Sequence, residues 1–204
     1  MIDLYAAGTA NGMRARIGLE ECGLAYTLHP IDLTKGEQKK PPFLSLNPNG
    51  QIPVIVDSEG PGGQPVTVSQ SVAVLLYCAE KSGKFLPTDP ATRPGFWQAL
   101  MSAASDISMT VTAILVLSRN KEQHAPAIEF FKTMWKNYAT VWDGRLAKQR
   151  YAAGNEVTIA DFALYGAIAR IKAVQPALLE GFTNVARWLD EIAARPAVQR
   201  ATKF

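Results

Sequence analysis

The stretch that decides the fold is Asn47-Pro48-Asn49-Gly50-Gln51-Ile52-Pro53-Val54-Ile55-Val56-Asp57, followed after a glycine-rich turn by Val68-Ser69-Gln70-Ser71. Pro53 stands at the start of an apolar, β-branched run, where it removes a backbone donor. One interpretation is an ordinary turn proline that opens a strand. The other is a cis peptide bond, which leaves the Ile52 backbone exposed to pair with a bound peptide. Both interpretations predict a strand that begins at Val54.

The composition is that of an ordinary globular protein. The 204 residues carry a net charge of +3, and 48% of them are apolar. The basic residues are scattered, which argues against a nucleic-acid partner. The start Met1–Tyr5 has no basic region typical of a signal peptide, and no uninterrupted apolar run reaches the roughly 18 residues that span a bilayer. We therefore expect a cytoplasmic protein with no membrane partner.

The first 85 residues alternate short strands and helices. Pro30 lies within the second predicted strand and places that strand at a sheet edge. Gly23 and Gly83 are predicted to end the two helices. The resulting order is βαβ followed by ββα. Strands are expected over 2–6, 26–33, 54–57 and 66–68, helices over 13–22 and 71–81, and an irregular segment with one short helix over 35–49.

The remainder of the chain has no strand pattern. Residues 85–94 contain three prolines and predict an interdomain linker. Apolar residues at helical spacing predict long helices over 96–118 and 126–149, followed by two or three shorter ones. The fold class is therefore α/β plus all-α. The expected domains are 1–83 and 95–204, joined by a linker over 84–94.

Two short polar clusters each precede a predicted helix. Thr9 or Asn11 would cap the first helix. Alternatively, the Thr9 hydroxyl and the Asn11 amide donate to an anionic sulfur beside the open N–H groups of the first turn. Ser69-Gln70-Ser71 has the same two interpretations, as a cap or as a site for a carboxylate.

Other reactive residue types lack a supporting pattern. His29 and His124 have no acid or nucleophile arrangement around them, and no metal-ligand spacing occurs, so no metal is expected. Cys22 and Cys78 fall inside or late in predicted helices, where nothing lowers a thiol pKa, so we expect them in the core. Thr158–Asp161 has the spacing of a structural capping box.

Taken in order, these motifs resemble the glutathione transferase superfamily over essentially the whole chain. The resemblance implies a thioredoxin-like N-terminal domain that binds glutathione and a C-terminal helical bundle that covers an apolar second-substrate site. It also implies a homodimer. Met1–Tyr5, Thr9 with Asn11, and Asp32–Gln38 are most similar to the nu class, bacterial enzymes that reduce disulfides with glutathione and have no cysteine nucleophile of their own.

The resemblance also implies roles for individual residues. Two departures stand out: Gln70 occupies a position that is usually acidic, and Phe130, with Lys132 two residues on, occupies the place of a fifth-helix arginine that nu-class proteins tend to have. The implied roles are Thr9 and Asn11 facing the glutathione sulfur, Gln38 and Gln51 at the glycyl end, Ile52 before cis-Pro53 on the cysteinyl backbone, and Gln70 and Ser71 at the γ-glutamyl end.

The sequence thus predicts a glutathione-dependent enzyme that activates the glutathione thiolate for disulfide reduction or for conjugation to a small electrophile. The alternative is a non-catalytic binding or interaction protein of the same fold, which the amide at Gln70 favours. The second substrate is expected to be a small apolar or disulfide molecule. Its pocket would use side chains such as Trp97, Met101, Met109 or Trp135.

Overall fold

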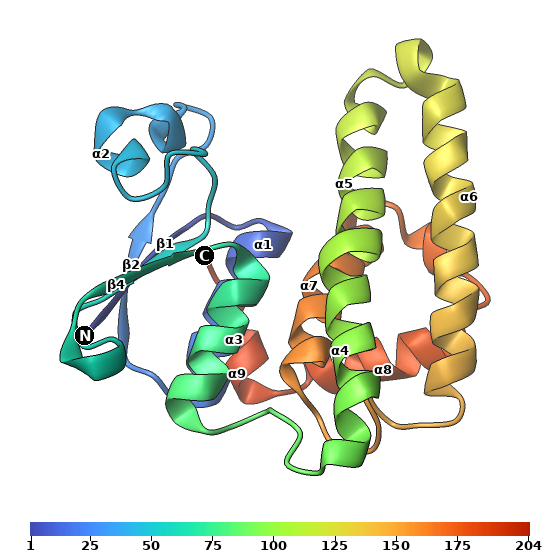
Figure 1. Ribbon diagram of the computed structural model, residues 1–204. Coiled ribbons are helices and arrows are strands. Elements are labelled where there is room, and N and C mark those ends of the chain that lie inside the picture. Colours follow the sequence, from blue (N-terminus) through green and yellow to red (C-terminus); the bar gives the residue numbers. More distant parts are fainter. The chain divides into compact units, whose positions relative to one another are not determined.

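A computed structural model describes residues 1–204, with the exception of the side chain of Lys121. The chain divides into two compact units. Residues 1–86 and 194–204 form the first, and residues 87–193 form the second. The first unit contains the sheet, and the second is built from helices (Figure 1).

The sheet of the first unit has four strands in the order β2-β1-β3-β4. β1 pairs parallel with β2 and antiparallel with β3, and β3 pairs antiparallel with β4. The predicted βαβ-ββα order is confirmed, and Pro30 lies in an edge strand, where its missing donor costs no ladder bond. The strands are β1 Ile2–Ala6, β2 Tyr26–Pro30, β3 Val54–Asp57 and β4 Val66–Ser69.

Helices α1 and α3 pack together, and the inward residues of β1 are fully buried beside them. Both helices end at a glycine in the left-handed conformation, Gly23 with φ 71° and Gly83 with φ 69°. That conformation favours glycine because a Cβ would be strained there, so the predicted helix ends are confirmed. The helices are α1 Ala10–Cys22, α2 Pro41–Leu44 and α3 Ser71–Ser82, with 3₁₀ turns at Glu37–Lys39 and Pro61–Gly63.

The C-terminal residues belong to the first unit, whereas the sequence analysis assigned them to the helical region 95–204. Helix α9, Pro196–Ala201, packs on α1. The guanidinium of Arg195 donates to both carboxylate oxygens of Glu21 at 2.6 and 2.7 Å, and Arg200 donates to Glu20 at 2.7 Å. Glutamates on a helix surface give no sequence signal of their partners, so this docking was not predicted.

In the second unit, the predicted helix 96–118 is interrupted. A π-helical segment, Ala103–Ile107, joins α4 to α5, and the Ser108 hydroxyl donates to the Ala103 carbonyl. Such segments insert one extra residue without ending the helix, which an apolar stripe does not reveal. The helices are α4 Arg93–Ser102, α5 Ser108–Leu117, α6 Lys121–Leu146, α7 Ile159–Val174 and α8 Thr183–Ala193, with 3₁₀ turns at Pro90–Thr92, Ser118–Asn120 and Pro176–Leu179.

One helical stretch, Pro90–Asn120, is long and apolar enough to cross a membrane by length and composition, with a mean hydropathy of 1.7. Polar residues are interspersed along this stretch, so it contains no uninterrupted apolar run that would have predicted it from the sequence. In the structure it belongs to the second unit, where 33% of its apolar window is buried and Ile107, Val111 and Ile114 face the core.

The capping box at the start of α7 is confirmed. The buried Asp161 carboxylate accepts from the Thr158 amide at 2.9 Å, the Ala152 amide at 2.8 Å and the Trp188 indole at 2.9 Å. Burial raises the pKa of Asp161, and these donors oppose the shift. This carboxylate therefore holds three segments of the helical unit together.

Asp57, at the end of β3, is a second buried carboxylate. It accepts from Tyr77 Oη at 2.6 Å, from Lys81 Nζ at 2.8 Å and from the Glu59 amide at 2.9 Å. Burial alone would raise the pKa of Asp57, but the hydrogen bonds from Lys81 and Tyr77 outweigh burial and lower it to about 2. The ionised form is thus the one that stabilises the folded sheet.

The stability of the first unit should depend on Asp57 in acid. Because the folded pKa lies below the unfolded one, the stabilisation is complete above about pH 4 and is lost as the pH falls towards 2. We expect Asp57→Asn to lower the free energy of unfolding by up to about 2 kcal/mol at pH 6, with the difference from wild type narrowing by pH 3. Urea unfolding across this pH range measures it. The control is Glu59→Gln at the neighbouring exposed carboxylate. Its difference in unfolding free energy from wild type should not narrow between pH 6 and pH 3.

Candidate functional site

The pairing register relates three of the predicted site segments to one another: the turn after β1, the turn after β4 and the Ile52–Pro53 peptide. Val54 lies opposite Ser69 on β4 and opposite Tyr5 on β1. Continuing both registers outward places the Ile52–Pro53 peptide between the turn that follows β1 and the turn that follows β4. The N-termini of α1 and α3 begin in those same turns.

At the start of α1, Thr9 is the capping residue. Its Oγ1 accepts from the Gly12 amide at 3.1 Å. A hydroxyl has one donor in addition to its acceptor lone pairs, so the Thr9 proton remains available. Capping and donation to a ligand, the two interpretations of the sequence, are therefore compatible at this residue.

The Asn11 carboxamide is oriented by two donors. Arg14 Nη1 donates to Asn11 Oδ1 at 2.9 Å, and the Ser71 hydroxyl donates to the same oxygen at 3.3 Å. Because a guanidinium only donates, the oxygen must face Arg14. The amide nitrogen Nδ2 makes no hydrogen bond with the described residues and is left as an exposed donor.

Arg14 lies under this turn and is only 2% exposed. Burial lowers the pKa of its guanidinium to about 10, which leaves the side chain charged at neutral pH. A buried charge adds to the positive potential at the N-terminus of α1. The turn is thus suited to hold an anion.

The start of α3 is also open. Gln70 is its N-cap residue, yet the Gln70 side chain makes no capping hydrogen bond. Its backbone has φ 75° and ψ 121°, a region that non-glycine residues rarely occupy. Such strain is characteristic of functional sites, where the surrounding structure imposes it. The exposed Gln70 amide and the first N–H groups of α3 are available to a carboxylate.

The Ile52–Pro53 peptide bond is cis. Neither the N–H nor the C=O of Ile52 has a hydrogen-bond partner among the described residues. The cis interpretation of the opening motif is therefore confirmed, and the Ile52 backbone is free to pair with an extended ligand.

Gly50, the residue before Gln51, lies close to the backbone of Gln38. A Cβ at Gly50 would lie 2.9 Å from the Gln38 carbonyl oxygen, and Gly50 has φ 60°, so only glycine fits this turn. Lys39 Nζ also donates to the Asn49 carbonyl at 3.1 Å. The Gln38 Oε1 is buried and has no hydrogen-bond partner among the described residues. Unpartnered buried atoms of this kind are uncommon and mark a place where a ligand or water completes the network.

The chain's own thiols do not contribute to this site. Cys22 and Cys78 are buried and free, as expected. Burial raises the pKa of both thiols, which disfavours the reactive thiolate. Within the described residues, no group of three or more metal-binding side chains occurs.

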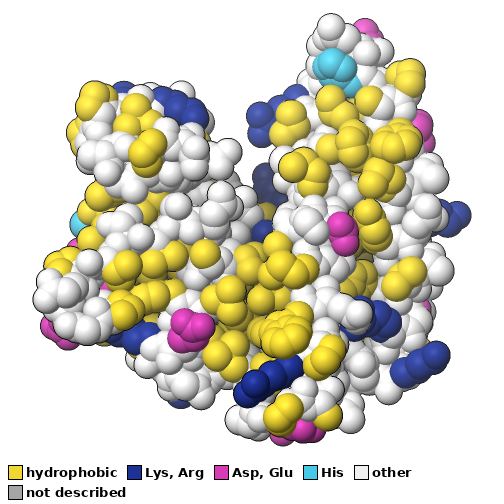
Figure 2. All heavy atoms as spheres, in the orientation of Figure 1, with side chains coloured by type: hydrophobic (Ala, Val, Ile, Leu, Met, Phe, Trp, Pro, Cys, Tyr) yellow, Lys and Arg dark blue, Asp and Glu magenta, His cyan; other side chains and the backbone are white. Residues whose placement is uncertain are grey.

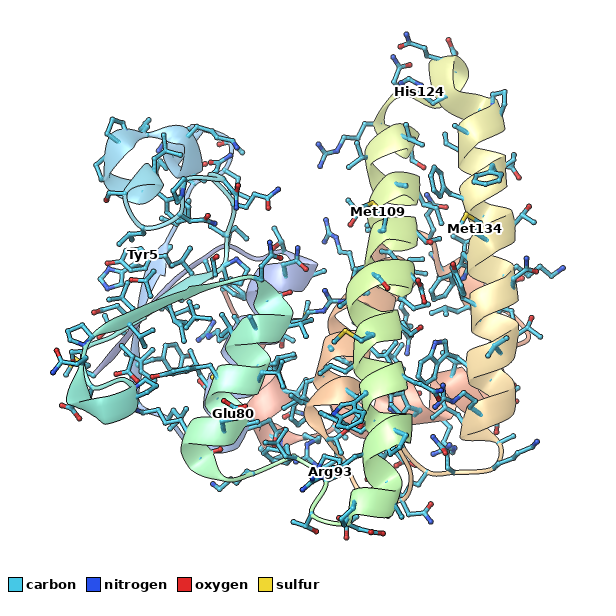
Figure 3. The ribbon with its side chains drawn as sticks, viewed as in Figure 1. Tyr5, Glu80, Arg93, Met109, His124 and Met134 are labelled. Carbon is cyan, nitrogen blue, oxygen red and sulfur yellow. The ribbon has the colours of Figure 1, made fainter. Side chains whose placement is uncertain are left out.

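The four side chains considered for a second-substrate pocket divide into two kinds. Trp135 is a core residue whose indole donates to the Leu178 carbonyl at 2.8 Å. Trp97, Met101 and Met109 are more than half exposed on the second unit. Met109 lies on α5, and hydrophobic side chains gather along α5 and α6 (Figures 2 and 3).

Sequence reasoning missed two residues at the site. Arg14 follows Asn11 by three positions, a spacing at which helical side chains meet, and it interrupts an otherwise apolar buried face. This charged residue on the apolar face was the sequence signal that could have identified Arg14 as part of the site. Lys39 gave no such signal, because it belongs to the pair Lys39-Lys40, and paired lysines are typical of an exposed surface.

Comparisons with known proteins agree over the whole chain. Residues 10–81 match the family model described as Glutathione S-transferase, N-terminal domain, and residues 105–196 match the corresponding C-terminal domain. The chain is 34% identical over 203 residues to the Escherichia coli disulfide-bond oxidoreductase YfcG, with 98% of this chain and 94% of that protein covered. It is 33% identical to YghU of the same organism, covering 98% of this chain and 73% of YghU.

Two solved structures are similar throughout. A glutathione transferase family member from Pseudomonas fluorescens, with two glutathione bound, has a TM-score of 0.93 at 33% identity and covers 99% of this chain and 92% of its own. A glutathione transferase from Pseudomonas putida, with one glutathione disulfide bound per subunit, has the same TM-score and identity and covers 100% of this chain and 91% of its own.

The strain at Gln70 has a measurable consequence. We expect Gln70→Gly to leave the free energy of unfolding unchanged or to raise it by up to about 1 kcal/mol, because glycine tolerates a positive φ. The matched control is Gln64→Gly at a residue with φ −99°, where the same change should destabilise by about 0.5–1 kcal/mol. Urea unfolding measures both. Equal destabilisation at the two positions would show that Gln70 carries no backbone strain.

Proposed function

This chain belongs to the glutathione S-transferase family, and we propose that its first unit binds glutathione at the sheet edge and uses the thiolate to reduce disulfides. The sulfur would lie at Thr9 and Asn11. The glutathione backbone would pair with Ile52, and the two carboxylate ends would be held by Gln70 with Ser71 and by Gln38 with Gln51. The relatives named disulfide-bond oxidoreductases support this choice of reaction.

The orientation of the Asn11 amide is the observation that carries the proposal. Arg14 and Ser71 hold Oδ1, which leaves Nδ2 as a donor on the same helix turn that Thr9 caps. Two donors at a helix N-terminus favour the anionic form of a sulfur and lower the pKa of its thiol. A free thiol has a pKa near 8.5, so this stabilisation increases the thiolate fraction at neutral pH.

The remaining groups match the polar ends of the tripeptide. The unpaired Ile52 backbone suits the cysteinyl residue by strand addition. The open N-terminus of α3 suits the γ-glutamyl carboxylate, with the Gln70 side chain accepting from the ammonium. At the glycyl end, the amide nitrogen of Gln38 would donate to the second carboxylate.

The proposed reaction needs two molecules of glutathione. The first thiolate attacks one sulfur of the substrate disulfide, forms a mixed disulfide and releases the other sulfur as a thiolate, which takes up a proton. A second glutathione thiolate then attacks the glutathione sulfur of the mixed disulfide, giving glutathione disulfide and the second substrate thiol. The related structures with two glutathione, or with glutathione disulfide, support this sequence of steps.

We further propose that the protein is a cytoplasmic homodimer. Two free cysteines fit a reducing compartment. The exposed apolar side chains of the second unit, which include Trp97, Met109 and Phe130, supply surface that a second copy would cover. Its second substrate would be a small disulfide or apolar molecule.

Replacing Asn11 tests the sulfur site. We expect Asn11→Ala to lower kcat/KM for the reduction of hydroxyethyl disulfide by about 10- to 100-fold, because one charge-assisted hydrogen bond is lost. Calorimetric titration with reduced and oxidised glutathione measures binding alongside the assay. The thiol pKa of bound glutathione, followed by thiolate absorbance, should rise in the variant.

Asn137→Ala, on the exposed face of α6, is the matched control and should retain full activity. Conjugation of chlorodinitrobenzene in place of disulfide reduction would favour a conjugating transferase. A folded protein that binds neither form of glutathione would overturn the proposal and support the non-catalytic alternative.

The amide at Gln70 is expected to limit glutathione affinity. We expect Gln70→Glu to tighten the binding of reduced glutathione by about 3- to 10-fold, since a carboxylate gives the ligand ammonium a charge-assisted partner roughly twice as strong. Calorimetry at low ionic strength measures the change. The control is Gln64→Glu, which adds the same charge at an exposed residue away from the site and should leave the glutathione affinity unaltered. An equal gain in affinity in that variant would show that the effect comes from net charge.

A further inference from the structure

The C-terminal residues lie against the turn that precedes α1, inside the first unit (Figure 1). A Cβ at Gly8 would lie 3.4 Å from the Phe204 Cβ and 3.7 Å from its Cγ, so Phe204 borders the residue before Thr9. Gly8 is exposed, and glycine has more backbone freedom than any other residue. A side chain packed beside Gly8 therefore limits the movement of the turn that carries Thr9.

One arginine side chain on α1 holds these C-terminal residues in place. Arg16 Nη1 donates to the Lys203 carbonyl, and the guanidinium carbon of Arg16 lies 5.1 Å from the centre of the Phe204 ring. A guanidinium over an aromatic face is attracted by the electron density of the ring. The positions of Lys203 and Phe204 beside the turn thus depend on Arg16.

The guanidinium of Arg16 is itself fixed by neighbouring elements. Its Nε donates to Tyr26 Oη on β2 at 2.7 Å, and Tyr26 Oη donates to Glu20 Oε1 at 2.9 Å. The other Glu20 oxygen accepts from Arg200 Nε on α9 at 2.7 Å. Burial would raise the pKa of Glu20, but the hydrogen bonds from Arg200 and Tyr26 outweigh burial and lower it, so Glu20 stays ionised. Because the donors of a guanidinium have fixed directions, these bonds determine where Nη1 of Arg16 points.

We propose that Arg16 is a positioning residue for the sulfur site, an inference that rests on the proposed function. Arg16 donates to Tyr26 and Lys203 rather than to Thr9. It therefore acts on the Thr9 hydroxyl only through the C-terminal residues and Gly8. A donor that moves by about 1 Å loses much of its effect on a thiolate, because a hydrogen bond weakens steeply with distance and angle.

Arg200 provides a matched comparison, because it docks the same C-terminal segment onto α1. Its guanidinium pairs with Glu20 at 2.7 Å, whereas the side-chain contacts with Lys203 and Phe204 come from Arg16. If the two arginines only held the segment onto α1, substituting either one would have the same effect on the site. If Arg16 positions the turn, only the substitution of Arg16 affects the donor at the sulfur site.

The first test uses the free protein. The Gly12 amide donates to Thr9 Oγ1, so the hydrogen exchange of that amide reports how firmly the turn is held. We expect Arg16→Gln and Phe204→Gly each to speed this exchange by about 5- to 10-fold, measured by nuclear magnetic resonance. Arg200→Gln should change the exchange rate by less than about 2-fold.

The second test follows the pH dependence of hydroxyethyl disulfide reduction with glutathione. We expect Arg16→Gln to lower kcat/KM by about 3- to 10-fold at about pH 6.5. The loss should narrow towards about pH 9.5, because a thiol with an ordinary pKa near 8.5 is then ionised without help from Thr9. Gly8→Ala in the Arg16→Gln background should restore part of the activity, since a methyl group at Gly8 restricts the same turn.

Circular dichroism shows whether each variant is folded, and Arg16→Lys, which keeps the charge without the forked donors, replaces Arg16→Gln if that variant is not. Gly12 exchange that is equal in the Arg16 variant and in Arg200→Gln would overturn the proposal. A loss of activity that is the same at every pH would do so too, because it would reflect a general structural defect. Faster Gly12 exchange in a folded protein that binds no glutathione would instead overturn the proposed function and leave Arg16 as the residue that holds the turn.

Discussion

The pairing of β3 with β4, which sets Val54 opposite Ser69, is the constraint on which the site depends. A slip of one residue would turn every side chain of β3 to the other face of the sheet. It would also move the Ile52 backbone away from the N-terminus of α3. The buried Asp57 at the other end of β3 opposes such a slip, because its three hydrogen-bond partners are fixed on the following turn and on α3.

Arg14 contributes a buried positive charge at the N-terminus of α1. Burying a guanidinium is unfavourable unless its donors are paired, and one of them is paired with the Asn11 carboxamide. The same hydrogen bond determines which end of that carboxamide faces outward. The Arg14–Asn11 hydrogen bond thus serves both the pairing of the buried guanidinium and the orientation of the proposed sulfur ligand.

Most of the fold was predictable from local signals in the sequence. Gly23 and Gly83 ended their helices because both adopt a positive φ, and Pro30 marked an edge strand. The motif around Pro53 suggested a cis peptide bond as one of two interpretations. The resemblance to a family then favoured ligand binding over simple capping at the polar turns. The strand register relates the Ile52–Pro53 peptide to the turns at the starts of α1 and α3, and the roles of these residues towards glutathione are a proposal.

Two features of the fold were missed. The π-helical segment at Ala103–Ile107 leaves the apolar stripe nearly unchanged, and the partners of Glu20 and Glu21 lie far along the chain.

The ion pairs of Glu20 and Glu21 with the C-terminal residues have a consequence for protein engineering. Because the chain leaves the first unit at Leu86 and returns to it at Ala194, an excised fragment that ends at the linker would lack part of its own unit. A stand-alone version of the sheet unit would need residues 194–204 attached through a new connection.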